Sequence, residues 1–113
     1  MFQTRQLEDV FQQVEISTAT ISPGAVANGA ANAVYVAAAF TTPGGVAASF
    51  NAGDYLIVIP PLGAAVNGVS IDATGTATAG TAGVAFTNVT GGSITPASGK
   101  YTIIAIRITP TLS

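Results

Sequence analysis

Residues 53–61 constrain the fold of this chain more than any other stretch. Five consecutive apolar residues, 55–59, place large side chains on both sides of an extended chain. This pattern is typical of a strand that is covered on both faces. Pro60 and Pro61 end the run because proline has no N–H to donate to a neighbouring strand. Residues 101–108 show the same pattern, and we predict that the two runs are the central strands of an all-β domain.

Turn residues separate further short apolar runs along the chain. They recur at roughly the eight-to-twelve-residue spacing of a sandwich or barrel. Residues 41–52 are rich in Gly, Ala, Ser and Thr and predict a loop, with Phe50 as its buried anchor. The predicted fold is a single-domain antiparallel β-sandwich of jelly-roll type over residues 14–113. Its other strands are expected at residues 14–21, 31–37, 66–73 and 83–89.

The first thirteen residues differ from the rest of the chain. They hold every Gln of the sequence and contain neither Gly nor Pro. Apolar residues at i, i+3, i+4 and i+7 fit a short helix that begins after Thr4, and a frayed terminus is the alternative. Two phenylalanines on an otherwise polar terminus favour a third interpretation. Residues 1–13 would then be an N-terminal arm that docks on a neighbouring subunit through Phe2, Leu7, Val10 and Phe11.

Charge is nearly absent from the chain. Only 7% of its 113 residues are charged, against about a quarter in a typical soluble domain. Three basic residues cannot form the basic stripe that nucleic acids require or a polybasic contact with a membrane surface. A soluble monomer usually keeps charges on its surface. We therefore expect copies of this chain or another protein to cover the body of the domain.

The abundance of small side chains supports the same expectation. Alanine makes up much of the 49% apolar fraction but offers little area to bury. Such a thin core suits a domain that is stabilised by subunit contacts. Residues 16–53 are uncharged and long enough to span a bilayer, but Pro and Gly interrupt them repeatedly. We expect neither a membrane span nor a signal peptide.

Catalytic chemistry has little support in this sequence. His and Cys, the commonest general bases, metal ligands and nucleophile partners, are absent. Asp54 and Asp72 could in principle pair as the carboxylates of a glycosidase, but each lies at or near a predicted turn, which favours a capping role. The sequon at Asn88 is a three-residue pattern that arises often by chance. We predict no enzymatic activity, no cofactor and no metal site.

Arg107 is the most unusual charged residue because it lies inside an apolar strand. It is expected to pair with Asp54 or Asp72 across the sheet, or to mark a contact between subunits.

The order of several motifs resembles small structural proteins of tailed bacteriophages. Their recurring pattern is a strand ending in Thr-Ile-x-Pro-Gly, then Ala-Asn, and a Gly-Asp-led apolar strand ending in Pro-Pro. Phe-x-Asn-x-Thr-Gly-Gly and Pro-x-Ser-Gly-x-Tyr follow, before an apolar strand that ends in Arg. These motifs stand here at residues 20–24, 27–28, 53–61, 86–92 and 96–107.

The resemblance implies a component of the virion. The function we expect is that of a capsid decoration, or cement, protein on the outer surface of the phage head, made in the host bacterial cytoplasm. Its partners would be the major capsid protein and copies of itself, as a homo-oligomer and most simply a trimer. The alternative is a fibre, spike or tail-associated module that binds a host receptor or glycan. The absence of Trp and the position of all three Tyr inside predicted strands disfavour that alternative.

Overall fold

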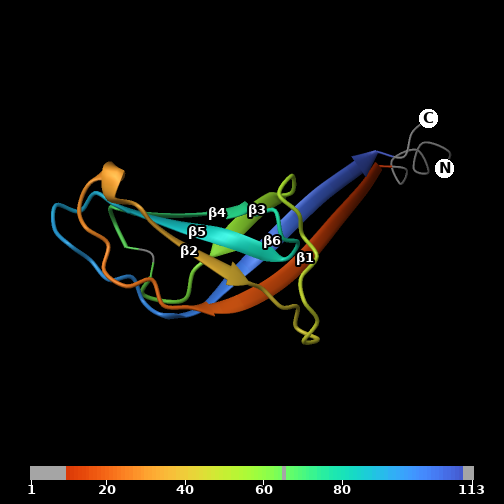
Figure 1. Cartoon of the computed structure of the whole chain (residues 1–113), viewed down its shortest axis with the longest axis horizontal. Helices are drawn as coiled ribbons and strands as arrows, with labels where there is room; N and C mark the ends of the chain where they lie inside the picture. Colours follow the sequence, from red (N-terminus) through yellow and green to blue (C-terminus); the bar gives the residue numbers. More distant parts are fainter. Residues whose placement is uncertain (1–9, 65, 111–113) are drawn as a thin grey trace.

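Two three-stranded antiparallel sheets make up the fold in a computed structural model, which describes residues 10–64 and 66–110. One sheet has the order β1-β6-β3 and the other has the order β2-β5-β4 (Figure 1). A single turn of 3-10 helix, η1 (Ala30–Asn32), precedes β2. The strands are β1 (Val10–Ile21), β2 (Val34–Ala39), β3 (Tyr55–Ile59), β4 (Val69–Gly75), β5 (Thr81–Asn88) and β6 (Gly99–Pro110).

The middle strands of the two sheets, β5 and β6, supply half of the twelve buried hydrophobic residues of the described chain. Burial alternates strictly along β5, as expected for a strand with one covered face. Phe86 of β5 meets Tyr101 of β6 edge to face, with ring centroids 5.7 Å apart and an interplanar angle of 86°. Ile103 and Val84 belong to the same buried cluster, so the two sheets pack against each other through one core. The prediction of an all-β, antiparallel fold is confirmed.

The prediction that residues 53–61 form a central strand is wrong. β6 is central, as expected, but β3 pairs only with β6 and lies at the edge of its sheet. Leu56 and Val58 face the core, whereas Tyr55, Ile57 and Ile59 are exposed. A strand with apolar residues on both faces is usually covered on both faces, but in this single chain only one face of β3 is covered.

The start of β1 also differs from the prediction. Residues 10–13 pair in register with residues 107–110 of β6, so the expected boundary between residues 13 and 14 falls inside a strand. The helical interpretation is wrong for residues 10–14, because hydrogen bonding to β6 outweighs a helical spacing of apolar residues that is marginal in so short a segment. Phe2 and Leu7 lie outside the described residues.

The long loop between β2 and β3 is packed rather than loose. Phe50 is buried, as predicted, and meets Phe40 edge to face with ring centroids 6.0 Å apart. The backbone of Gly80, between β4 and β5, donates to the carbonyl of Phe50 at 2.8 Å and accepts from the N–H of Phe40 at 2.9 Å. The loop is therefore anchored at both aromatic residues to the turn that precedes β5.

Candidate functional site: an apolar sheet face and a polar clamp

The outer face of the β1-β6-β3 sheet carries large apolar side chains in two adjacent rows. Residues directly opposite each other in antiparallel strands share one face of the sheet. The register therefore places Val14, Ile106 and Tyr55 in one row and Ile16, Ile104 and Ile57 in the next. Ile59 continues this surface along β3. We call this set the apolar face: Val14, Ile16, Tyr55, Ile57, Ile59, Ile104 and Ile106.

The apolar face is open to solvent in the single chain. Its exposed fractions are 67% for Tyr55, 55% for Val14, 49% for Ile16, 47% for Ile59 and 37% for Ile57. Single exposed apolar residues are common on soluble proteins, whereas a contiguous group of this kind marks an interaction surface. The exposed parts of these five side chains amount to about 500 Å², at the upper end of the largest patch on a typical monomer.

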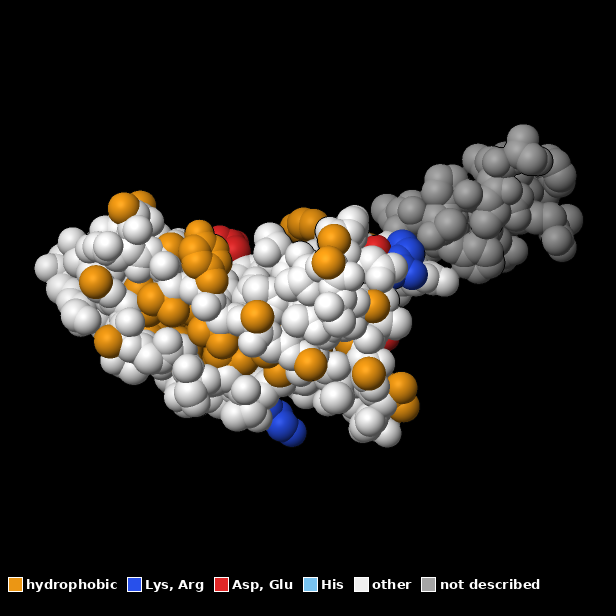
Figure 2. Space-filling view, in the orientation of Figure 1, with side chains coloured by type: hydrophobic (Ala, Val, Ile, Leu, Met, Phe, Trp, Pro, Cys, Tyr) orange, Lys and Arg blue, Asp and Glu red, His pale blue; other side chains and the backbone are white. Residues whose placement is uncertain are grey.

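The other sheet presents a different outer surface. The same register argument places small or polar residues on the outer side of β2, β5 and β4, among them Ala37, Gly83 and Thr74. Tyr35 is the one large apolar side chain there. Figure 2 shows one side of the molecule, where hydrophobic side chains are scattered among uncharged atoms and charged side chains appear at few places. Large apolar residues are thus concentrated on one sheet.

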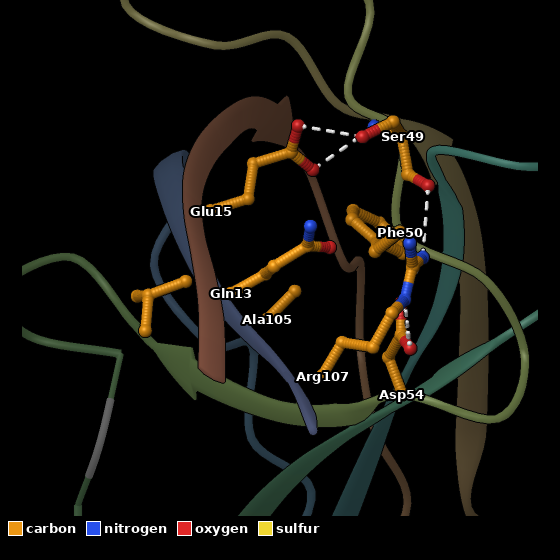
Figure 3. Close-up of a pocket in the computed structure, with 8 residues that line it drawn as sticks. Gln13, Glu15, Ser49, Phe50, Asp54, Ala105 and Arg107 are labelled. Carbon is orange, nitrogen blue, oxygen red and sulfur yellow. Dashed lines mark hydrogen bonds and ion pairs between the residues drawn. The ribbon is translucent and has the colours of Figure 1, made fainter. Parts of the chain in front are cut away.

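Arg107 forms a polar clamp at the end of the same sheet (Figure 3). Its guanidinium donates from Nε to Asp54 Oδ1 at 2.8 Å and from Nη2 to Asp54 Oδ2 at 2.7 Å. Asp54 also accepts from the backbone N–H of Asn51 at 2.8 Å, which caps the turn before β3. The pairing of Arg107 with Asp54 predicted from the sequence is confirmed. The alternative partner, Asp72, lies exposed in the middle of β4 rather than at a turn.

A second carboxylate completes the clamp. Glu15 of β1 accepts from both the backbone N–H and the hydroxyl of Ser49, at 2.9 and 3.0 Å. No local pattern in the sequence indicates this contact, because residues 34 positions apart meet only through the fold. Together the two carboxylates and Arg107 fasten the loop of residues 40–54 across β1 and β6, around a cavity of about 250 Å³.

The electrostatics of the clamp favour a structural role for Asp54. Hydrogen bonds from the Arg107 side chain hold the pKa of the Asp54 carboxyl below its ordinary value, with a further contribution from the Asn51 N–H and against the opposing effect of burial. A general acid requires the opposite change, a raised pKa. Asp54 also holds the pKa of Arg107 above its usual value. The charges of Arg107 and Asp54 therefore neutralise each other.

Metal-binding clusters of three or more His, Cys, Asp or Glu side chains do not occur among the described residues. A groove of about 520 Å³ runs between the edge strands β3 and β4 and includes both Asp54 and Asp72. Because Arg107 pairs with Asp54 and lowers the pKa of its carboxyl, Asp54 is not suited to be the general acid of a glycosidase. In the part of the chain that the structure describes, no helix is long and apolar enough to cross a membrane.

Asn88, which opens the Asn-x-Thr sequon, is buried. Its side-chain amide donates to the carbonyls of Val26 and Gly92, at 2.9 and 2.7 Å, and its oxygen accepts from the N–H of Thr90 at 2.9 Å. Asn88 thus holds the loop after β5 against the segment before β2. A glycan on this nitrogen would replace one of its two N–H donors, and the buried side chain would have to leave its site to accommodate the sugar.

Of the interaction residues predicted from the sequence, the structure places two on β1 and one in the clamp. Val10 and Phe11 pair with Pro110 and Thr109 of β6, and Arg107 pairs with Asp54. Phe2 and Leu7 lie outside the described residues. The apolar face itself was missed. Its signal was present, since residues 14, 16, 55, 57 and 59 are apolar, but assigning them to one exposed face requires the pairing of β1, β6 and β3.

Comparison with protein-family models, curated proteins and solved structures finds no match to this chain. Its function is therefore argued from the surface and the sequence.

Proposed function

We propose that this chain is a non-enzymatic virion structural protein, a capsid decoration protein that reinforces the head lattice of a tailed bacteriophage. It would act as a homo-oligomer on the outer surface of the capsid, bound to the major capsid protein. The order of motifs at residues 20–24, 53–61, 86–92 and 96–107 supports a phage origin. The physical character of the surface supports a role in assembly.

The observation that carries the proposal is an exposed apolar face on a domain with almost no charge. Burial of apolar surface contributes about 25 cal/mol per Å², so leaving the apolar face in water forgoes a large stabilisation. The rest of the domain has few charged side chains that could keep the protein soluble despite this apolar face. A component of a permanent assembly has no need of that solubility once its partners are bound.

The fold suits this role as a jelly-roll-like β-sandwich. Each of β2, β3 and β4 lies in the sheet opposite to the strand before it, and β1 and β6, the first and last strands of the described chain, pair side by side. Alternation of this kind is what a jelly roll requires, here reduced to six strands from the usual eight. Both ends of the described chain lie at the same end of the molecule (Figure 1), the end from which the N-terminal arm predicted over residues 1–13 would contact a neighbouring subunit.

A fibre, spike or tail-associated module that binds a glycan is the second candidate, and one observation favours it. Tyr35 and Tyr55 are more exposed than their positions inside strands suggested, and exposed aromatic rings are common in sugar sites. The two rings lie on the outer faces of different sheets, however. In a sandwich those faces point in opposite directions, so the rings cannot form one platform.

Binding to phage heads at two salt concentrations tests the proposal. Heads that lack the protein are incubated with the purified chain at about 0.1 M and about 1 M salt, where the Debye length falls from about 10 to about 3 Å. Because the contact is neutral, occupancy should change by less than about twofold. A steep loss with salt would contradict the neutral contact. Imaging that finds the chain on tail fibres and not on heads would overturn the decoration role.

A further inference from the structure

The apolar face must be matched to a particular occupant, and the structure favours one. We propose that the apolar face of β1, β6 and β3 is the surface through which copies of this chain associate with one another. The inference names a surface and does not depend on attachment to a phage head, since the purified chain alone would show it.

Area is the first argument. The exposed parts of the apolar face amount to about 500 Å², so packing two such faces together buries roughly 1,000 Å² before their edges are counted. That reaches the minimum of about 1,000 Å² expected of a biological interface, and Thr18 and Thr102, which lie in the next row with Ile59, extend the surface.

Charge is the second argument. The two rows of the apolar face contain no charged side chain. Identical faces brought together by a symmetry axis therefore meet no like-charge repulsion, which is the usual obstacle to self-association of a polar surface. Lys100 lies at the far end of the same outer face, opposite Thr20 of β1 and beyond the last row in which β3 takes part.

β1 and β6 also form a two-stranded ribbon at one end of the molecule. β3 pairs with β6 only as far as Ile106, while β1 and β6 continue together to Val10 and Pro110. Figure 1 shows the two strands extending beyond the rest of the fold. An isolated pair of strands is marginal in water and needs a third strand or a packed face. The ribbon continues directly from the apolar face, so a copy packed on that face also lies beside the ribbon.

The core of the single chain is thin, so contacts between subunits would add substantially to its stability. Four of the twelve buried hydrophobic residues in the described chain are alanines, which bury little area. Subunit contacts stabilise a folded state of this kind by mass action. A trimer would place three apolar faces around one axis, and a dimer would pair two.

Matched tyrosine variants test the inference. Tyr55 on the apolar face and Tyr35 on the opposite sheet are strand residues that point outward, and they are 67% and 74% exposed. The molar mass of the full chain, Tyr55→Lys and Tyr35→Lys is measured by light scattering over a dilution series, with circular dichroism as the folding check. We expect an oligomer for the full chain and for Tyr35→Lys. For Tyr55→Lys the concentration of half-dissociation should rise at least about tenfold.

A second variant guards against misfolding. Ile16→Thr keeps a high strand propensity while removing apolar surface, and it should weaken association in the same direction. A monomeric full chain, or equal dissociation of the two tyrosine variants, would overturn the inference. A chain that is monomeric in solution yet binds heads through the apolar face would assign that face to the capsid protein. That result would overturn the inference and leave the proposed function standing.

Discussion

Three glycine-to-alanine substitutions test how tightly the loop of residues 40–54 packs on the sheets. Gly24 has a φ of 76° with nothing within 4 Å of an added Cβ, so Gly24→Ala measures the cost of positive φ alone. Gly75 has no such φ, but its Cβ would lie 2.7 Å from Ala52 Cα and 2.9 Å from Asn51 O. Gly80 combines both penalties, with a φ of 77° and a Cβ that would fall on the carbonyl oxygen of Ala48.

The expected magnitudes follow from these environments. A non-glycine residue in the left-handed region costs about 1–2 kcal/mol, and overpacking against fixed backbone costs about 1–3 kcal/mol. Gly24→Ala should therefore lose about 1–2 kcal/mol of unfolding free energy, and Gly75→Ala about 1–3 kcal/mol. Gly80→Ala should lose about 3–5 kcal/mol, since its carbonyl and N–H also bind Phe40 and Phe50.

Urea unfolding followed by circular dichroism measures these differences. In a domain of this size each kcal/mol lowers the melting temperature by about 4 °C, so Gly80→Ala should melt about 12–20 °C below the parent chain. If Gly80→Ala is no less stable than Gly24→Ala, the loop does not approach Gly80 closely. The account of the loop as a packed element would then be wrong.

Two further substitutions test the clamp and the core. The pKa of Asp54 is lowered in the folded state chiefly by Arg107. The stabilisation that the ionised Asp54 carboxylate gives the fold is therefore complete above about pH 4, and it is lost as the pH falls through the folded-state pKa. Urea titrations from about pH 6 to about pH 2 should show the parent chain losing about 1 kcal/mol more than Asp54→Asn, and parallel profiles would contradict the clamp. Ser17 is buried, and its hydroxyl has no hydrogen-bond partner among the described residues, so Ser17→Ala should raise the unfolding free energy by about 1 kcal/mol; a decrease would mean that the hydroxyl has a partner.

Local patterns predicted the parts of the fold that depend on neighbouring residues. The strand near residues 83–89, the buried anchor at Phe50 and the pairing of Arg107 with Asp54 could all be inferred from the sequence. What could not be inferred depends on which strands become neighbours. The same apolar run in β3 fits a central strand covered by its own chain or an edge strand covered by another. Likewise, Glu15 meets Ser49 only after β1 and the loop are brought together.

The helical spacing around Val10 shows the same limit. Residues 7, 10, 11 and 14 fit a helix, whereas residues 10, 12, 14 and 16 form the alternation of a strand in which three positions are apolar. Pairing with β6 selects the second pattern, and that pairing is a property of the whole fold.

Cysteine labelling tests most directly whether the apolar face is covered when the protein is assembled. The chain has no Cys, so Tyr55→Cys and Tyr35→Cys each introduce one thiol at strand positions of similar exposure. Reaction rates with a thiol reagent are compared in dilute solution, where the chain is dissociated, and in the assembled state. We expect the thiol at position 55 to react at least about tenfold more slowly once assembled, while the thiol at position 35 keeps its rate. Equal rates at both positions in both states would contradict a covered apolar face.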